Sequence, residues 1–515
     1  FFEKIKRIKL FMKNQDSNLK DEKIIFNKEL NIWEALIPVG LLIMMLAYNI
    51  YNGGEIFGQY SNHYILLIGG VIAAAVGLFN KVGMGTMIME VWENLKSVLT
   101  PLLILFLVGS LAGTWMISGI VPSMVYYGLQ ILSPTIFLAA SVVICAIISL
   151  GTGSSWTTSA TVGIALVSIA GAMNIPLGMA AGAIISGAYF GDKMSPLSDT
   201  TNLAPAMAGS DLFTHIKYMA WTTVPSIVIT LVVFIVIGFT MDIAEPTSKN
   251  TLISDMLTNK FNITPWVFIV PAIVVGTIVM KVKPLIALAI GALLGGIFAV
   301  IYQPEVIKEL TGVATLDFTS NIKGVWTALI SSTELALPDT SEFQQLGDDT
   351  KGNLSKLLQG KGMEGMLWTV YLIISAMVFG GVMDAIGALS RISSALLSLS
   401  DSIFGLFAST VASCLALNIT ASDQYLAIVV PGKMFAKAYE EKGLAPENLS
   451  RTLEDSGTVT SVLIPHNTCG AYQSGVLGVD VGDYFFYAIF NWLSPFMTLL
   501  FAAFRIKIKM LADKK

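Results

Sequence analysis

Charged residues are scarce in this 515-residue chain and are missing altogether from one long stretch. Asp, Glu, Lys and Arg make up 13% of the sequence, and none of them, nor His, occurs from Pro101 to Phe190. Hydrophobic residues make up 54%, and the mean hydropathy is +0.71. Long uncharged runs of this kind exclude an ordinary soluble domain and differ from the short alternating strands of a β-barrel. They predict a helical protein that crosses the bilayer several times.

Cysteine and histidine are rare as well, with three of each in the chain. The cysteines show no CxxC spacing and lie among apolar residues, which favours buried thiols over a disulfide framework or a zinc site. Three histidines without an HExxH motif argue against a metalloprotease. The net charge of −4 is too small to indicate a nucleic acid partner. We therefore expect neither a cofactor nor a bound nucleic acid.

Apolar runs of about the 20 residues that a helix needs to cross the hydrocarbon core recur in the same order in two halves of the chain. Each half contains single runs, an apolar pair around a polar tip, a run broken by polar residues, and a last single run. In the first half these lie at 33–51, 63–81, 101–120, 134–150 with 157–175, 177–208 and 218–241. In the second half they lie at 264–281, 284–303, 365–389, 403–417 with 424–436, 447–476 and 482–504.

If each apolar pair is a re-entrant hairpin, each half crosses the membrane five times, and an odd number of crossings inverts the second half relative to the first. We therefore predict an all-α polytopic membrane protein with two inverted-topology repeats, each with about five crossings, one hairpin and one broken helix. The predicted segments are a cytoplasmic basic segment 1–31, a first transmembrane repeat 32–241, a linker 242–263, a second transmembrane repeat 264–505 with a polar loop 304–364, and a cytoplasmic tail 506–515.

Lysine and arginine are distributed unevenly over the predicted loops. Eight of them precede residue 29, and others follow alternate spans, at Lys81, Lys96, Lys217, Lys281, Lys283, Arg505, Lys507 and Lys509. The loops 52–62, 121–133 and 477–481 contain none. Because positive charges gather on the cytoplasmic side of membrane proteins, both termini should be cytoplasmic.

Two polar stretches interrupt the apolar sequence of the first half, the tip Gly151–Ser159 and the stretch Gly191–Pro205. An ionisable group within the membrane costs at least about 2.5–3.5 kcal/mol and is a functional-site candidate by default. Hydroxyls, free backbone carbonyls and a few carboxylates are ligands for a hard monovalent cation. The candidate ion- or substrate-binding residues of this half are Thr152, Gly153, Ser154, Ser155, Asp192, Ser198, Asp199, Thr200, Thr201 and Asn202.

Asp199 is the leading candidate among them. It follows Pro196 and stands beside Ser198, where the chain cannot continue as an unbroken apolar helix. A carboxylate there would let a proton and a sodium ion compete for one site, and such competition suffices for exchange. The alternative is that Asp199 only caps the second half of the broken helix.

The second half has a polar tip at Asn418–Asp423 and a break that begins near Asp455. Its candidate binding residues are Asn418, Thr420, Ser422, Asp423, Asp455, Thr458 and Thr460. Two broken helices and two polar tips that meet near the middle of the membrane would form one cavity. Within that cavity, the predicted Na⁺ ligands are Asp199, Thr200 and Asp423.

Other ionisable residues near the breaks are less specific. Asp192 and Lys193 are neighbours, so they do not face each other on a helix, and each could pair across the bundle or reach water. Arg451 is close to Glu454 in the sequence, which favours an ion pair that only orients helices over a binding role for Glu454. His466 fits a structural histidine better than a proton carrier.

One stretch resembles a known family. The residues Gly187-Ala-Tyr-Phe-Gly-Asp-Lys-Met-Ser-Pro-Leu-Ser-Asp-Thr-Thr-Asn-Leu-Ala-Pro205, followed by Gly209-Ser-Asp-Leu-Phe-Thr-His-Ile-Lys217, resemble the signature of the NhaC family of sodium/proton antiporters. That family also contains malate/lactate antiporters and transporters assigned to amino acids. The resemblance, which runs from about residue 30 to 508, implies an elevator-like inverted-repeat fold with hairpin tips at the site and Na⁺ as the coupling ion.

The leading hypothesis is a secondary active transporter, a Na⁺/H⁺ antiporter of a bacterial cytoplasmic membrane. An alternative is a Na⁺-coupled transporter of a small organic acid or amino acid, as in malate/lactate exchange. An intramembrane hydrolase with Ser154 or Ser155 as nucleophile would have no base nearby in the sequence, so we do not expect an enzyme. The expected partners are Na⁺, H⁺ and the lipid bilayer, with a small carboxylate or amino acid in the alternative. A homodimer stays open.

Overall fold

The computed structural model describes residues 29–241, 247–336 and 358–511, together with Ile25, Asn27, Gly352 and Ser355. Within these residues the regular structure is almost entirely helical. The strands β1 (Thr333–Glu334) and β2 (Gln359–Gly360) form one short antiparallel pair. Nine helices of the described part, or ten if a bent pair counts as one span, are long and apolar enough to cross a membrane. The predicted all-α polytopic class is therefore confirmed, and the chain is an integral membrane protein.

The first half of the chain forms long helices and two broken ones. They are α2 (Ile32–Tyr51), α3 (Ser61–Phe79), α4 (Met84–Ser97), α5 (Leu99–Ile117), α6 (Ile120–Ile131), α7 (Pro134–Thr152), α8 (Ser155–Thr158), the π-helical η1 (Ser159–Gly163), α9 (Ile164–Ala172), α10 (Leu177–Met194), α11 (Asp199–Ala208) and α12 (Leu212–Thr240). The predicted spans fall on these helices. α12 begins earlier than the predicted residue 218, because Asp211 caps it by accepting a hydrogen bond from the Thr214 backbone N–H.

The second half follows the same order with more short helices. They are α13 (Thr247–Lys260), the 3₁₀ segment η2 (Pro265–Phe268), α14 (Ile269–Val279), α15 (Pro284–Tyr302), α16 (Pro304–Thr311), α17 (Phe318–Ile330), η3 (Glu364–Met366), α20 (Leu367–Ala385), α21 (Ala388–Leu397), α22 (Ile403–Thr420), α23 (Leu426–Glu441), α24 (Pro446–Leu453), the π-helical η4 (Glu454–Thr458), η5 (Ser461–Leu463), α25 (Thr468–Leu477), α26 (Val481–Tyr484) and α27 (Ile489–Ala503). The predicted polar loop 304–364 thus contains two helices, α16 and α17, and the last predicted span is divided between α26 and α27.

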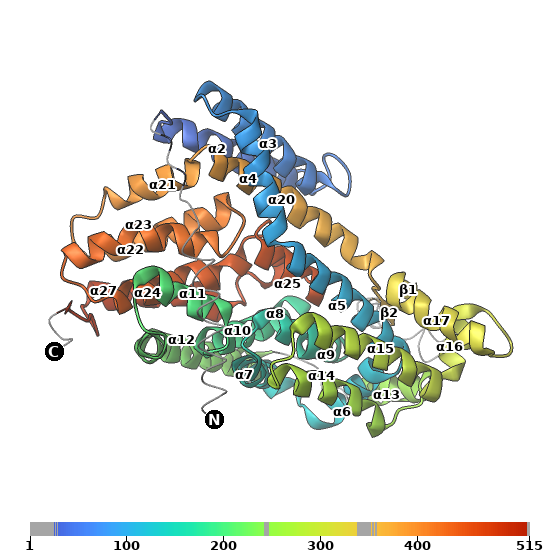
Figure 1. The fold of residues 1–515 in the computed structure, drawn as a ribbon. Coiled ribbons are helices and arrows are strands. Elements are labelled where there is room, and N and C mark those ends of the chain that lie inside the picture. The colour runs from blue at the N-terminus through green and yellow to red at the C-terminus, as the bar shows by residue number, and fades with distance from the viewer. Residues whose placement is uncertain are drawn as a thin grey trace.

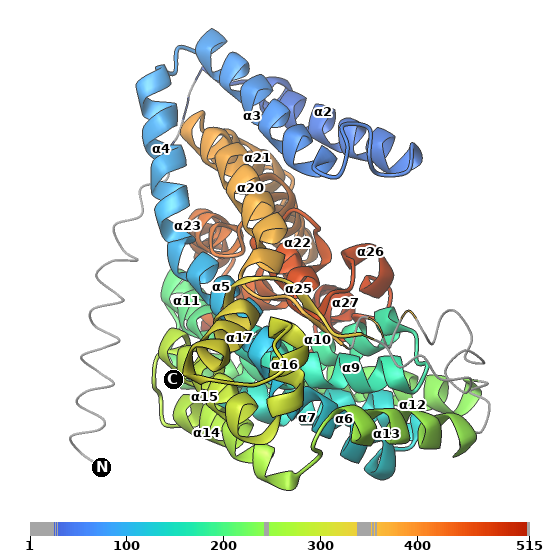
Figure 2. The same cartoon turned by 90° about the vertical axis from the view of Figure 1, so that its right-hand side faces the viewer.

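Helices of each half pack against helices of the other half. α3 of the first half packs against α20 of the second, and α15 of the second half packs against α5 of the first. α2 and α3 stand out at the top of Figure 1, and α4 connects them to α5 along one edge of the molecule (Figure 2). This reciprocal packing fits a pair of related repeats. The inversion of one repeat relative to the other stays a prediction.

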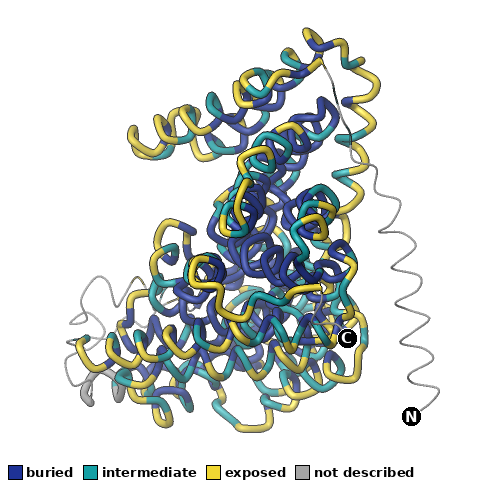
Figure 3. Tube along the Cα trace, turned by 90° about the vertical axis from the view of Figure 1, so that its left-hand side faces the viewer, coloured by how far each residue is buried: buried dark blue, intermediate teal, exposed yellow. Residues whose placement is uncertain are grey.

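The broken helices lie in the middle of the molecule. α24, α11, α8, α10 and α25 occupy a central layer between α20 above and α12, α7 and α14 below (Figure 1). Buried residues are concentrated there, whereas α2 and α3 carry many exposed residues, and α2 is the more exposed of the two (Figure 3). Exposed apolar side chains on that arm, such as Ile50 at 72% exposure, are the surface that lipid would cover. The core of the fold therefore coincides with the polar stretches of the sequence.

Each half has a tight hairpin tip, as predicted. The tip between α7 and α8 turns at Gly153, with φ of +70°, and the tip between α22 and α23 turns at Ser422, with φ of +57°. A side chain at Gly153 would also collide with the break of the first broken helix, since an added Cβ would lie 2.6 Å from Leu197 Cβ. Glycine is thus required at the first tip on two counts.

Some predicted segments lie partly outside the described residues. These include most of the basic segment 1–31, residues 242–246 of the linker 242–263, most of 337–357 in the polar loop, and residues 512–515 of the tail 506–515. The described part of the tail is tied to the loop before α24, where the Ala445 backbone N–H donates to Lys509 O (2.9 Å). The predicted segment boundaries stay predictions.

Candidate functional site

The two tips and the two breaks of the helices meet in the central layer. In the second half the Thr468 backbone N–H, at the start of α25, donates to Ser422 O of the tip (2.9 Å). The halves join where Trp156 of the first tip stacks on Tyr472 of α25, with ring centroids 3.9 Å apart, while Tyr472 Oη donates to Trp156 O (3.2 Å). The candidate site thus draws on residues from both halves of the chain.

Asp192 connects the first tip to the first broken helix. It lies near the end of α10 and is 8% exposed. One of its carboxylate oxygens accepts hydrogen bonds from the backbone N–H (3.1 Å) and from Oγ (2.7 Å) of Ser155. Two donors on one oxygen stabilise the ionised form of a buried carboxylate. The predicted residues Asp192 and Ser155 are therefore brought together.

Lys193 and Asp455 form a fully buried ion pair between the two broken helices. Both side chains are 0% exposed, and Lys193 Nζ contacts Asp455 Oδ1 and donates to Ser494 Oγ of α27 (2.9 Å). Asp455 Oδ2 accepts from Thr222 Oγ1 of α12 (2.8 Å) and from the hydroxyl of Thr498. Lys193 thus pairs across the bundle, one of the two possibilities left open by the sequence. Its charge is compensated in place.

Glu454, next to Asp455, differs because only part of its carboxylate is used. Its Oε1 accepts from Thr200 Oγ1 of α11 (3.1 Å), and its Oε2 has no hydrogen-bond partner among the described residues. Glu454 is 0% exposed. The predicted ion pair with Arg451 is absent from the described part of the chain, where the Arg451 guanidinium lies over the rings of Tyr218 (4.5 Å) and Phe501 (5.9 Å). The sequence argument against Glu454 is therefore wrong.

The buried cluster is unbalanced in charge. Within the described residues it holds the carboxylates of Asp192, Glu454 and Asp455 and the ammonium of Lys193. Asp192 and Lys193 both act electrostatically on Glu454. If all four groups are ionised, two negative charges are left without a counter-charge, and an isolated buried carboxylate is strongly unfavourable. The cluster therefore favours the uptake of protons or metal cations.

Asp199 and Asp423 lie at the border of this cluster. Asp199 is exposed and is the first residue of α11, where Ser198, not Asp199, is the N-cap. Asp423 is 7% exposed and accepts from the backbone N–H groups of Tyr425 (2.8 Å) and Leu426 (3.0 Å) at the start of α23. The carboxylates of both aspartates act electrostatically on the Tyr425 side chain. Thr200, the next residue after Asp199, is buried and donates a hydrogen bond from its Oγ1 to Glu454.

Most of the other candidate residues hold the backbone of the tips and breaks. Ser154 caps α8, Thr201 Oγ1 donates to Lys193 O (2.9 Å), and Asn202 Nδ2 donates to Ser198 O (2.6 Å). Among the remaining ones, Thr152 Oγ1 contacts Thr158 Oγ1 (3.5 Å), Asn418 Nδ2 donates to Gly457 O (2.8 Å) and Thr460 Oγ1 (3.0 Å), and Thr420 Oγ1 donates to Ala416 O (2.9 Å). The hydroxyls of Ser422 and Thr458 have no hydrogen-bond partner within the described residues.

The sequence analysis did not identify the site residues on the last helix of each half. Thr222, Ser494 and Thr498 lie on α12 and α27, and each contacts the Lys193–Asp455 pair. His215 of α12 was missed too. It is fully buried, its Nδ1 lies 2.8 Å from Ser450 Oγ, and Asp455 and Lys193 act on it electrostatically. Hydroxyls at helical spacing in an otherwise apolar span were the available signal for the threonines.

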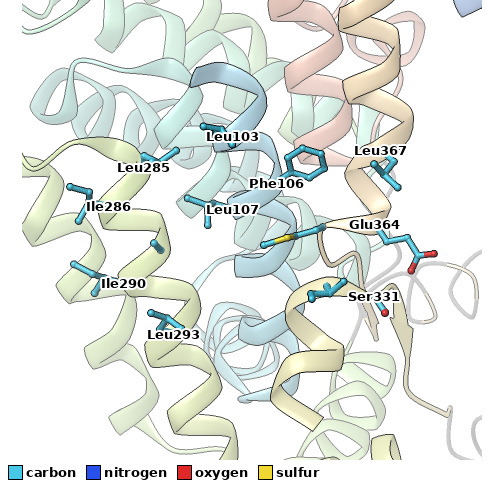
Figure 4. A pocket seen from close by; sticks show the side chains of 13 residues that line it. Leu103, Phe106, Leu107, Leu285, Ile286, Ile290, Leu293, Ser331, Glu364 and Leu367 are labelled. Carbon is cyan, nitrogen blue, oxygen red and sulfur yellow. The ribbon is translucent and has the colours of Figure 1, made fainter. Parts of the chain in front are cut away.

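A separate groove does not have the chemistry of an ion site. It has a volume of about 950 Å³ and lies between α5, α15, the end of α17 and the start of α20 (Figure 4). Apolar side chains such as Leu107 and Ile290 line its walls, and the polar residues Ser331 and Glu364 lie at one edge. Because a cation needs converging oxygen ligands, the groove is not the transport site. His466 Nε2 lies 2.8 Å from Ile419 O, a contact that fits the structural histidine expected from the sequence, and the role of His466 stays a prediction.

Comparison with known proteins gives one consistent family. The profile of the Na⁺/H⁺ antiporter family matches residues 187–506. The chain is 37% identical to the Na⁺/H⁺ antiporter NhaC of Alkalihalophilus pseudofirmus over 88% of this chain and 93% of that protein. It is 32% identical to NhaC of Bacillus subtilis, over 90% and 96%, and 32% identical to the malate-2H⁺/Na⁺-lactate antiporter of the same organism, over 90% and 92%. The chain therefore belongs to the Na⁺/H⁺ antiporter family, as its resemblance to NhaC antiporters predicted.

Proposed function

We propose that this protein is a secondary active transporter that exchanges Na⁺ for H⁺ across a bacterial cytoplasmic membrane, without a cofactor or an enzymatic reaction. The observation that carries the proposal is the buried cluster with three carboxylates and one ammonium, made by Asp192, Glu454, Asp455 and Lys193. Because the cluster has more negative than positive groups, binding of either Na⁺ or H⁺ stabilises it electrostatically. If Na⁺ and H⁺ cannot bind together, their competition couples the two fluxes.

The proposed Na⁺ ligands are Asp199, Thr200 and Asp423, of which Asp199 is open to solvent and Thr200 reaches into the interior. No three His, Cys, Asp or Glu side chains of the described residues converge on one point. The ion would therefore be held by one or two carboxylates together with hydroxyl and carbonyl oxygens, which suit a hard monovalent cation. The two broken helices would present this one site to each side of the membrane in turn.

The exchange of an organic acid is the second candidate, because the malate-2H⁺/Na⁺-lactate antiporter of Bacillus subtilis is a relative over 90% of the chain. A carboxylate substrate would need a cation in the site. The buried Lys193 is already paired with Asp455 and bound to Ser494. The geometry therefore supports exchange of inorganic cations better.

Flux measurements in proteoliposomes separate the two candidates. We expect an outward Na⁺ gradient to acidify the lumen and an inward Na⁺ gradient to alkalinise it, with no requirement for an organic substrate. Malate, lactate and several amino acids are added in turn with the same gradients. If Na⁺ flux appears only when one of these compounds is present, the proposed Na⁺/H⁺ exchange is wrong and the protein transports that organic compound.

The proposed orientation, with both termini in the cytoplasm, predicts which loops react with an impermeant thiol reagent in intact cells. Cysteines placed at the exposed residues Gln59 and Asp480 should be labelled from outside, and one at the exposed Lys283 should not. The background is low because the three native cysteines are buried. Labelling of Gln59→Cys and Lys283→Cys from the same side would contradict the proposed topology.

A further inference from the structure

We propose an inner cation site at Glu454, in which the free carboxylate oxygen and the hydroxyls of Thr458 and Thr200 bind Na⁺. The proposal rests on the proposed Na⁺/H⁺ exchange and adds a second position to it. This inner site lies behind Asp199 and Asp423, and Thr200 connects the two positions because it follows Asp199 and contacts Glu454 (3.1 Å).

Two unused oxygens define the inner site. Oε2 of Glu454 and Oγ1 of Thr458 are buried and lack hydrogen-bond partners within the described residues. The Thr458 side chain is 1% exposed, and its hydroxyl lies near the Glu454 carboxylate. Buried polar atoms are nearly always hydrogen bonded, so two free ones on neighbouring side chains indicate a missing ligand. Neutral hydroxyls and a carboxylate are oxygen ligands that a hard cation prefers.

The surrounding charges explain why this ligand must be a cation. The charged groups that act on Glu454 are Lys193 and Asp192, both on α10, and Asp455 is its neighbour in η4. Lys193 is engaged by Asp455, and Asp192 is a like charge. Arg451, the nearest positive residue on α24, lies against Tyr218 and Phe501. None of the ion pairs of the described residues includes Glu454, so a bound Na⁺ would supply the missing positive charge.

The backbone at this position is also irregular. η4 runs from Glu454 to Thr458 as a π-helix, and η1 provides a second π-helical segment in the first half. π-helical turns place an extra residue in one turn and occur often at functional sites. In η4 the widened turn brings Glu454 and Thr458 to the same place.

The test compares Glu454→Gln with Glu447→Gln in purified protein. Glu447 lies on the same side of the break, is 4% exposed in its side chain and has its charge balanced by Lys509 (3.0 Å), so it is a matched control. We expect Glu454→Gln to weaken Na⁺ binding at least about tenfold. Glu447→Gln should bind Na⁺ as the unmodified protein does. Binding is read from ²²Na⁺ retention.

A second pair of variants decides the matter if Glu454→Gln does not fold. Thr458→Val removes the hydroxyl at nearly constant volume, and Thr458→Ser keeps it. We expect about tenfold weaker Na⁺ binding for Val only. Equal Na⁺ affinity in Val, Ser and unmodified protein, or a folded Glu454→Gln protein with unchanged Na⁺ affinity, would overturn the inner site. Absence of Na⁺/H⁺ exchange by the unmodified protein would instead overturn the proposed function, so the two failures are distinguishable.

Discussion

Replacing Asp455 with Asn should lower the free energy of unfolding by about 3–5 kcal/mol, because Lys193 is left as a buried charge without its partner. Both side chains are 0% exposed, so neither water nor lipid headgroups can compensate the lost carboxylate. Lys193→Met should be similarly costly, since it removes the ammonium and leaves Asp455 charged. Thermal unfolding in detergent measures both effects.

The double variant, Lys193→Met with Asp455→Asn, is the control for this interpretation. Removing both charges should recover most of the stability lost in either single variant, because replacing a buried pair is far less costly than breaking it. Additive losses in the double variant would show that the two residues stabilise the protein independently. The buried ion pair would then have no special role.

Replacing Asp199 with Asn is expected to abolish Na⁺/H⁺ exchange while the protein still folds. The charge and the titration are lost, but the size is kept. Ser198 rather than Asp199 caps α11, so little stability should be lost. The comparison is Na⁺-dependent flux in liposomes that contain equal amounts of folded protein.

The control for Asp199→Asn is Asp211→Asn. Asp211 is also exposed and stands one helix later, where it caps α12 through Thr214 (3.1 Å). Asn is an equally good cap, so flux should stay near that of the unmodified protein. If Asp199→Asn instead exchanges ions normally with an unchanged pH profile, the ion ligand must be one of the other carboxylates, Asp192, Asp423, Glu454 or Asp455, and Asp199 serves as scaffold.

Features that depend on local sequence were predictable. The uncharged run from Pro101 to Phe190 predicted membrane helices, and α5, α7 and the segment from Ser155 to Ala172 are all long enough to cross. Gly153 and Pro196 marked the first tip and the first break correctly, because a positive φ and the missing N–H of proline are properties of single residues.

Features that depend on contacts between distant residues were not predictable. Lys193 and Asp455 are 262 positions apart, so no local pattern could pair them. Arg451 and Glu454 are three residues apart, which suggested an ion pair, but the helix changes from α to π at Glu454. Stacking of Arg451 on Tyr218 and Phe501, from α12 and α27, then takes the guanidinium away from Glu454. The sequence placed Asp199 inside the cavity, but its side chain is exposed in the structure. Its burial also depends on contacts with distant residues, which no local pattern predicts.

The measurement that tests the account most directly is the release of protons when Na⁺ binds to the purified protein in weakly buffered solution. The account predicts that adding NaCl acidifies the solution, that choline chloride does not, and that Glu454→Gln reduces the signal. The release should be largest at a pH at which the buried site still holds a proton that Na⁺ can displace. Na⁺ binding, shown by ²²Na⁺ retention, with no proton release at any pH would contradict competition between the two cations at one buried site.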